Sequence, residues 1–207
     1  MNVKSKIVAL FEKHTSLQNL NSLQAPWVSS FKDAKNLANT DADGNEIALT
    51  APQQYIKEHF STLVGSLIYM AITVRPDITT ITNKSCKGMH KPERKHVLFL
   101  ETALRYLKGT KEHGLTYTRS QSPAQSLTKS LSREYKELRA LAHSPIIGFS
   151  DANFADALDE RLRSTSGMAV YVYGNLVSWK SKMQTLTAKS TLQAELIAAA
   201  ATADECV

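Results

Sequence analysis

The sequence is poor in cysteine. Cys86 and Cys206 are its two cysteines among 207 residues, and neither stands in a Cys-x-x-Cys or Cys-His spacing. This pattern excludes a zinc ribbon and a disulfide framework, and it favours a reduced intracellular protein, cytoplasmic or nuclear. The six histidines show no metal-ligand spacing either, so we expect them at the surface.

Long hydrophobic runs are also absent. The longest one near the start, Ile7–Phe11, is shorter than a signal-peptide core and far below a membrane span. We therefore expect neither secretion nor membrane insertion. Lys4 and Lys6 leave an organellar transit peptide open, although Glu12 counts against one.

The positive charge is unevenly distributed. Lys and Arg number 25 against 19 Asp and Glu, a net charge of +6. Eight basic and two acidic residues lie between Lys84 and Lys111, and five basic and no acidic residues lie between Arg161 and Lys189. Both tracts suit a polyanion such as nucleic acid, although a solvated basic face is the commoner explanation of a single cluster.

The first half of the chain has helical periodicity. Residues 1–54 predict a helix over Val3–Lys13 followed by an irregular linker. Apolar residues then recur at helical spacing from Phe60 to Ile72, and Arg75-Pro76 ends that pattern. A second helix is predicted up to Lys108-Gly109, where the glycine would cap it.

The second half changes to a period of two. A short strand is predicted at Leu115–Thr118, then a Ser-rich and Lys-rich linker over 119–145 that contains a surface helix at Ser132–Ala142. Three antiparallel strands follow: Ile146–Phe154, Gly167–Tyr173 and Leu176–Met183, the last two joined by a turn at Gly174-Asn175. A capping-box spacing, Ser190-x-x-Gln193, starts an alanine-rich helix that we expect to cover the sheet.

Three stretches resemble the Pol polyprotein of copia-type retrotransposons. They are Phe60–Tyr69 with Thr73–Ile78; Leu104–Thr110 with His113–Tyr117; and the group Ser150–Phe154, Arg163–Gly167, Val177–Lys182 and Gln193–Leu196. The resemblance covers about residues 55–207. It implies an α/β (α+β) fold, in which a truncated ribonuclease H-like mixed sheet follows a helical segment.

The sequence patterns and the resemblance together predict a division of the chain. Residues 1–54 form a poorly defined helix and linker, and residues 55–118 a helical segment like the reverse-transcriptase connection. Residues 119–145 are a linker or insertion, and residues 146–207 the truncated ribonuclease H-like domain.

The resemblance also implies a catalytic and metal site at Asp151 and Glu195. In ribonuclease H such carboxylates hold Mg²⁺ for phosphodiester hydrolysis, which uses two ions. The family's later acids have no counterpart here, so we expect a vestigial site with Mg²⁺ binding that is weak or absent. A purely structural explanation of both acids stays open. Asp151 would then be a strand-end residue bonded to backbone amides, and Glu195 a first-turn acid favoured by the helix dipole.

Nucleic-acid contacts are expected in the second basic tract. The candidates are Arg161, Arg163, Ser164, Lys180 and Lys182. Ser164 is explained nearly as well as part of a polar turn.

The sequence therefore predicts a polyprotein fragment that binds RNA–DNA hybrid or other nucleic acid with little or no cleavage. The paired aspartates of the family's polymerase are absent, so we expect no template copying. Its partners would be nucleic acid and the rest of a retroelement polyprotein or a host complex. The alternative is a structural or interaction protein retained by a host, such as a basic ribonucleoprotein subunit, and an inert gene remnant is a third. No motif chooses among them.

Overall fold

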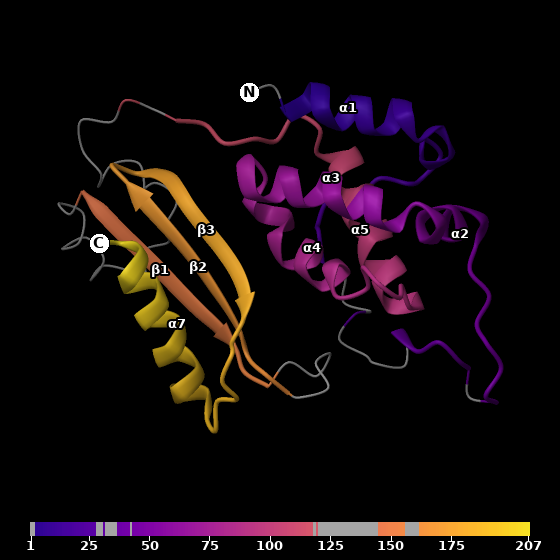
Figure 1. Ribbon diagram of the computed structural model, residues 1–207. Helices are drawn as coiled ribbons and strands as arrows, with labels where there is room; N and C mark the ends of the chain where they lie inside the picture. The colour runs from indigo at the N-terminus through magenta and orange to yellow at the C-terminus, as the bar shows by residue number, and fades with distance from the viewer. Residues whose placement is uncertain are drawn as a thin grey trace. The chain divides into compact units, whose positions relative to one another are not determined.

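The computed structural model describes residues 3–27, 31, 37–41, 43–117, 119, 145–155 and 162–207. The chain forms two compact units, Met1–Gly114 and Leu115–Val207, which are described separately below. The first unit is helical, and the second combines a sheet with one helix (Figure 1). The predicted α+β class is confirmed. The predicted helix at Ser132–Ala142 lies outside the described residues, and residues 115–117 form no strand, contrary to the prediction.

The first unit is built from five α-helices and two short 3₁₀ helices within the described residues. They are α1 (Val3–Lys13), η1 (Thr15–Leu17), α2 (Ala51–Glu58), α3 (Phe60–Thr73), η4 (Pro76–Ile78), α4 (Thr79–Cys86) and α5 (Arg94–Gly109). Helix α3 buries the apolar stripe that the sequence shows, including Leu63, Val64 and Leu67, none of which is exposed to solvent. It packs against α4 and α5, whose Ile81 and Leu104 are also buried. This stripe is the core of the unit.

Helix α5 anchors the segment that follows α1. The Arg105 Nε–H donates to the Asn21 carbonyl at 2.9 Å, and the Leu23 N–H donates to the Arg105 carbonyl at 3.1 Å. A Cβ at Gly109 would stand 2.5 Å from the Leu23 carbonyl oxygen. Gly109 is the last residue of α5 and has no positive φ, so it is not a left-handed cap. Its missing side chain makes room for the neighbouring segment.

The second unit contains β1 (Ile146–Asn153), β2 (Thr165–Val172), β3 (Asn175–Met183) and α7 (Thr191–Glu205). The sheet order is β1-β2-β3, and both pairings are antiparallel. The three predicted antiparallel strands are confirmed, and no parallel strand that would make the sheet mixed occurs in the described residues. The hairpin turn is Tyr173-Gly174, one residue earlier than predicted. Both residues have positive φ, which a two-residue type I′ turn requires.

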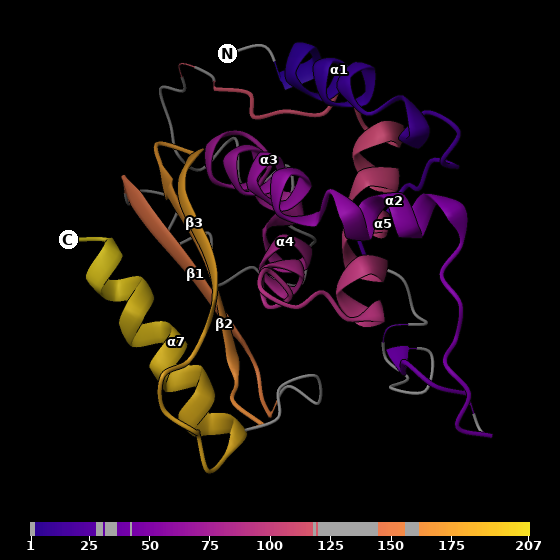
Figure 2. The same ribbon diagram turned by 45° about the vertical axis from the view of Figure 1, so that its right-hand side comes forward.

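Helix α7 lies along one face of the sheet (Figures 1 and 2). Its cap is the predicted one, because the Ser190 hydroxyl accepts a hydrogen bond from the Gln193 N–H at 3.1 Å. A Cβ at Gly148 in β1 would stand 2.8 Å from Thr202 Cγ2, so Gly148 faces α7. Its cross-strand partner Val170 is buried on the same face.

Candidate functional site

Asp151 lies near the end of β1, exposed to solvent and paired across the sheet with Gly167. Successive side chains of a strand point to opposite faces. The register of β1 on β2 is regular over its whole length, so this alternation is unbroken. Because Gly148 faces α7, Asp151 projects from the opposite face of the sheet.

Glu195 lies in the second turn of α7 and is exposed. Thr202 follows seven residues later, two helical turns on, and therefore shares its side of the helix. Since Thr202 contacts Gly148, that side is the one next to β1. Glu195 thus lies on the β1 flank of α7.

The start of α7 lies at the same end of the sheet as Asp151. The Gln184 side chain fixes this arrangement, because its Nε2 donates to the Ala194 carbonyl and to the Ser166 hydroxyl, each at 2.9 Å. Ser166 is paired with Ala152, the residue after Asp151. The structure therefore places Asp151 and Glu195 at one end of the sheet and beside the same outer strand, but on its two faces.

These two carboxylates do not make a complete magnesium cage. Among the described residues no three His, Cys, Asp or Glu side chains are grouped so that they could hold a metal ion. A two-ion phosphodiesterase needs more ligands than the two acids can supply. The two acids therefore do not fit a pair of Mg²⁺ ions, and no hydrolytic step follows from them.

The structure does not support the predicted contact of Ser164 with nucleic acid. Its side chain is fully buried, and the hydroxyl accepts a hydrogen bond from the Ala155 N–H at 3.2 Å. Its carbonyl accepts another from the Gln184 N–H at 2.8 Å. Ser164 has no exposed surface for a phosphate, and it joins the ends of β1 and β3 instead.

Lys180 and Lys182 both lie in β3, two residues apart and exposed. Lys182 is paired with Ser166 and Lys180 with Met168, so both project from the α7 face. The Lys180 ammonium is ion-paired with Glu205 at the end of α7, and the Ser178 hydroxyl donates to the same carboxylate at 2.6 Å. These hydrogen bonds, that of Lys180 foremost, hold the pKa of Glu205 below its usual value.

The remaining predicted contacts are Arg163 and Arg161. Arg163 is half-buried in the segment before β2, whereas Arg161 lies outside the described residues. The structure therefore gathers Lys180 and Lys182 on one face of the sheet and leaves Asp151 on the other. The lysine pair and the acidic pair do not form one surface.

Half of the eight basic residues in the first basic tract make contacts inside the first unit. Lys84 is buried, with its ammonium 5.9 Å from the centre of the Trp27 ring. Arg94 donates to the Ala38 carbonyl at 3.2 Å, and Lys108 donates to the Leu20 carbonyl at 2.7 Å. With Arg105, these four basic side chains hold the chain that runs before α2. The expectation of a polyanion-binding tract here is wrong for these four residues.

Two histidines expected at the surface are also buried. His14 Nδ1 lies 2.9 Å from the Tyr55 hydroxyl, and His96 Nδ1 accepts from the Glu93 N–H at 3.1 Å. Burial lowers the pKa of both imidazoles, and the positive charges of His59 and Lys95 lower it further at His14 and His96 respectively. A capping-box spacing, Glu93-x-x-His96, was the available sequence signal for His96.

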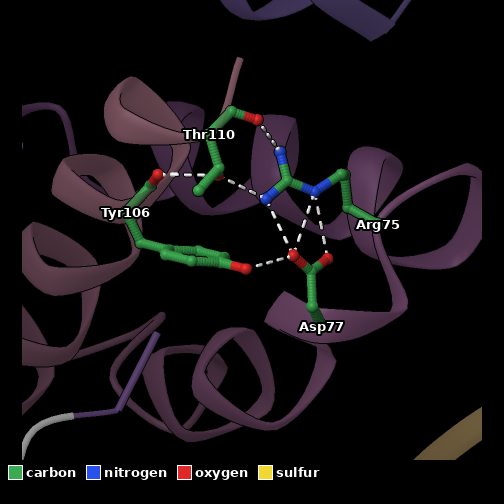
Figure 3. A network of polar contacts seen from close by, with 4 residues as sticks. All are labelled: Arg75, Asp77, Tyr106 and Thr110. Carbon is green, nitrogen blue, oxygen red and sulfur yellow. Dashed lines mark hydrogen bonds and ion pairs between the residues drawn. The ribbon is translucent and has the colours of Figure 1, made fainter. Parts of the chain in front are cut away.

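Sequence reasoning missed a buried polar network in the first unit (Figure 3). Arg75, 1% exposed, forms a bidentate ion pair with Asp77: Nη2 lies 2.8 Å from Oδ2 and Nε lies 3.0 Å from Oδ1. Its guanidinium also donates to the carbonyl and the hydroxyl of Thr110, at 3.0 and 2.7 Å. The Tyr106 hydroxyl completes the network by donating to Asp77 Oδ2 at 2.6 Å.

This network joins two of the motifs that carry the family resemblance, Thr73–Ile78 and Leu104–Thr110. Burial alone would raise the pKa of Asp77, but the hydrogen bonds from Arg75 and Tyr106 outweigh it, and the net pKa is lowered. Burial and the bond to Asp77 raise the pKa of Tyr106. The carboxylate is held ionised and fully paired, as in a structural ion pair rather than a catalytic acid.

The comparisons with known proteins bear on these motifs. Over 157 residues, 76% of this chain, the sequence is 34% identical to a retrovirus-related Pol polyprotein from transposon RE1 of Arabidopsis thaliana. Over 193 residues, 93% of the chain, it is 27% identical to the corresponding polyprotein from transposon TNT 1-94 of Nicotiana tabacum. The chain is a relative of copia-type retrotransposon Pol polyproteins.

The similarity to Pol covers a small part of those relatives. The chain spans 9% of the first polyprotein and 12% of the second. It is also 32% identical, over 146 residues, to an uncharacterized mitochondrial protein of Arabidopsis thaliana, of which it spans 51%. No protein-family model matches the chain, and no solved structure matches it significantly. No helix in the described part is long and apolar enough to cross a membrane.

Proposed function

We propose that this Pol-related chain carries the opening part of a ribonuclease H-like domain, which binds RNA–DNA hybrid through phosphate contacts and does not cleave it. The supporting observation is the placement of Asp151 and Glu195. They are 44 positions apart in the chain, one on a strand and one on a helix, yet they lie at one end of the sheet beside the same strand.

The proposed absence of cleavage rests on the count of ligands among the described residues. Two carboxylates on opposite faces of β1 supply too few oxygen ligands for a pair of Mg²⁺ ions, so charge building on a leaving oxygen would be unstabilised. Any Mg²⁺ held there would be a single, weakly bound ion. The chain would then recognise hybrid without turning it over.

Binding would be electrostatic. Lys182 and Lys180 are the described candidates on one face, with Arg163 close to the start of β2. Each neutralised phosphate releases counterions, so affinity should fall steeply as salt rises. The ion pair with Glu205 lowers the charge that Lys180 can offer.

An interaction protein is the second candidate. The observation that favours it is the internal use of Lys84, Arg94, Arg105 and Lys108, because half of the tract's eight basic residues stabilise the first unit. A compact, well-bonded unit of this kind would suit a scaffold for protein partners. One relative is named as a mitochondrial protein, and we include a location in an organelle in this second candidate.

The test is the affinity of the full chain for a labelled RNA–DNA hybrid as salt is varied. Lys180→Ala with Lys182→Ala should weaken binding and make the slope of log affinity against log salt shallower by about one per lysine that contacts a phosphate. Glu205→Gln should strengthen binding, because it releases Lys180 from its ion pair. The control is Lys57→Ala, an exposed lysine of α2 in the first unit, which should leave the affinity unchanged.

The proposal would be overturned by affinity that is insensitive to salt. It would also fail if the double substitution and Lys57→Ala had equal effects. In either case the interaction-protein candidate would replace it.

A further inference from the structure

A groove runs between α1 and α3 in the first unit. It has a volume of about 450 Å³ and is open to solvent. One stripe of each helix lines it, including Lys6, Leu10 and Lys13 from α1 and Gly65, Tyr69 and Met70 from α3. Both stripes follow helical spacing, so the groove extends along about two turns of each helix.

The two helices run antiparallel along this groove. The Lys6 ammonium, near the start of α1, lies 4.7 Å from the centre of the Tyr69 ring, near the end of α3. At the other end His14, just after α1, lies beside His59, just before α3, with ring centres 5.8 Å apart. The two helices therefore flank the groove while running in opposite directions.

The charge and polarity of the groove are distributed in an ordered way. Leu10 and Met70 are buried and form an apolar floor, and a Cβ added at Gly65 would meet nothing within 4 Å. Lys6 and Lys13 are exposed on one rim, seven residues and therefore about 10.5 Å apart along the helix axis. No acidic residue is among the described residues that line the groove.

This distribution selects a particular ligand. A ligand with two anionic groups about 10.5 Å apart on a partly apolar body would match the rise between the two lysine positions and the apolar floor. Two acidic residues seven positions apart on an α-helix have the same spacing of about 10.5 Å, with apolar residues three and four positions after the first facing the floor. A helix laid into a groove between two others also has favourable packing geometry.

Single-stranded nucleic acid fits less well. Its non-specific sites combine basic grooves with aromatic rings on which bases stack. The one aromatic ring among the described lining residues, Tyr69, already has the Lys6 ammonium over its face. We propose that the α1–α3 groove is a docking site for an acidic amphipathic helix of a partner protein.

The test uses the full chain and two synthetic helical peptides. One peptide carries two glutamates seven residues apart, with leucines three and four residues after the first, and the second carries lysines in place of the glutamates. The glutamate peptide should bind saturably in isothermal titration calorimetry, and the lysine peptide should bind at least about tenfold more weakly.

Two variants locate the site. Lys6→Glu with Lys13→Glu should reverse the preference, so that the lysine peptide becomes the tighter ligand. Gly65→Leu should abolish binding of both peptides by filling the groove, and circular dichroism should show that the helices remain. Lys57→Glu, outside the groove, is the matched control and should change neither affinity.

Three outcomes would overturn the proposal. They are the absence of saturable binding of the glutamate peptide, equal affinity for the two peptides, and unchanged binding by Gly65→Leu. Binding of an oligonucleotide that the Lys6→Glu, Lys13→Glu variant abolishes, in the absence of peptide binding, would assign the groove to nucleic acid instead.

Discussion

At the residue scale, Arg75 brings a positive charge into the first unit with 1% of its surface exposed. Desolvating a charge is costly unless it is paired and hydrogen-bonded. Asp77 supplies the opposite charge, and the carbonyl and hydroxyl of Thr110 take up other guanidinium N–H groups. Arg75-Pro76-Asp77 therefore serves to stabilise the folded first unit.

Replacing Arg75 by Met should destabilise the first unit by about 3 kcal/mol. This is the lower end of the range for breaking a buried ion pair, because the Asp77 side chain keeps 32% of its surface in water. Urea unfolding in a Trp179→Phe background would measure it, since Trp27 then reports on the first unit alone. Lys111→Ala, an exposed change in the same unit, should cost less than about 0.5 kcal/mol. Equal stabilities for the two variants would contradict the role given to Arg75.

The same network predicts a pH dependence. The pKa of Asp77 in the folded state lies below its ordinary value of 3.8, so the stabilisation from its ionised form is complete above that value. It is lost as the pH falls through the lowered pKa. The difference in free energy of unfolding between the wild type and Asp77→Asn, measured from pH 7 down to pH 3, should therefore shrink at the acid end. A difference that stays constant over this range would show that Asp77 is not ionised in the network.

Single residues were the hardest feature to predict from the sequence. Ser164 lay in a polar turn and was assigned to phosphate, but its burial depends on how the ends of β1 and β3 meet, which no local pattern shows. The network of Arg75 and Thr110 joins positions 35 residues apart, and that distance hides it from periodicity. The sequence likewise did not show which face of the sheet Asp151 and Glu195 lie on, because that depends on how α7 packs against β1.

At the scale of elements, prediction was more successful because periodicity is a local property. Helix α3, the three strands and the start of α7 at Thr191 all follow from apolar spacing or capping residues. One error is the strand predicted at Leu115–Thr118, because residues 115–117 form none. The others lie at the ends of elements. The turn falls on Tyr173-Gly174 because the pairing of Val172 with Asn175 sets the hairpin, and Gly109 is explained by a neighbour distant in sequence.

The contact of α7 with the sheet depends on small residues. A Cβ at Gly148 would stand 2.8 Å from Thr202 Cγ2 and 3.0 Å from Cys206 Sγ. Gly148→Ala should therefore destabilise the second unit by about 1–3 kcal/mol, the usual cost of overpacking. Thr202→Ser, which removes the methyl group and keeps a hydroxyl to donate to Ala198, should recover a large part of the loss.

Urea unfolding in a Trp27→Phe background, followed by Trp179 fluorescence, would measure the effect. Gly65→Ala in α3 is the matched control, read with Trp27 in a Trp179→Phe background. Its added Cβ meets no atom within 4 Å, and it should stabilise the first unit by up to about 1 kcal/mol. If the double variant Gly148→Ala, Thr202→Ser were no more stable than Gly148→Ala alone, the close approach of α7 at this point would be wrong.

At the scale of the whole molecule, the net charge of +6 has different meanings in the two units. In the first unit, basic side chains hold a preceding segment in place and flank the α1–α3 groove. In the second, Lys180 and Lys182 lie exposed on the sheet. Composition predicted an attraction to polyanions. The structure removes Lys84, Arg94, Arg105 and Lys108 from that role. It leaves Lys87, Lys91 and Lys111 exposed in the first unit and Lys180 and Lys182 exposed in the second.

Incubation of the full chain with a labelled RNA–DNA hybrid and Mg²⁺ is the most direct test of binding without cleavage. At protein concentrations that saturate the hybrid at low salt, the account predicts a shifted complex in which the RNA strand stays intact, with the same result for Asp151→Asn. Mg²⁺-dependent cleavage of the RNA strand that Asp151→Asn abolishes would contradict the account and show that the chain is a ribonuclease.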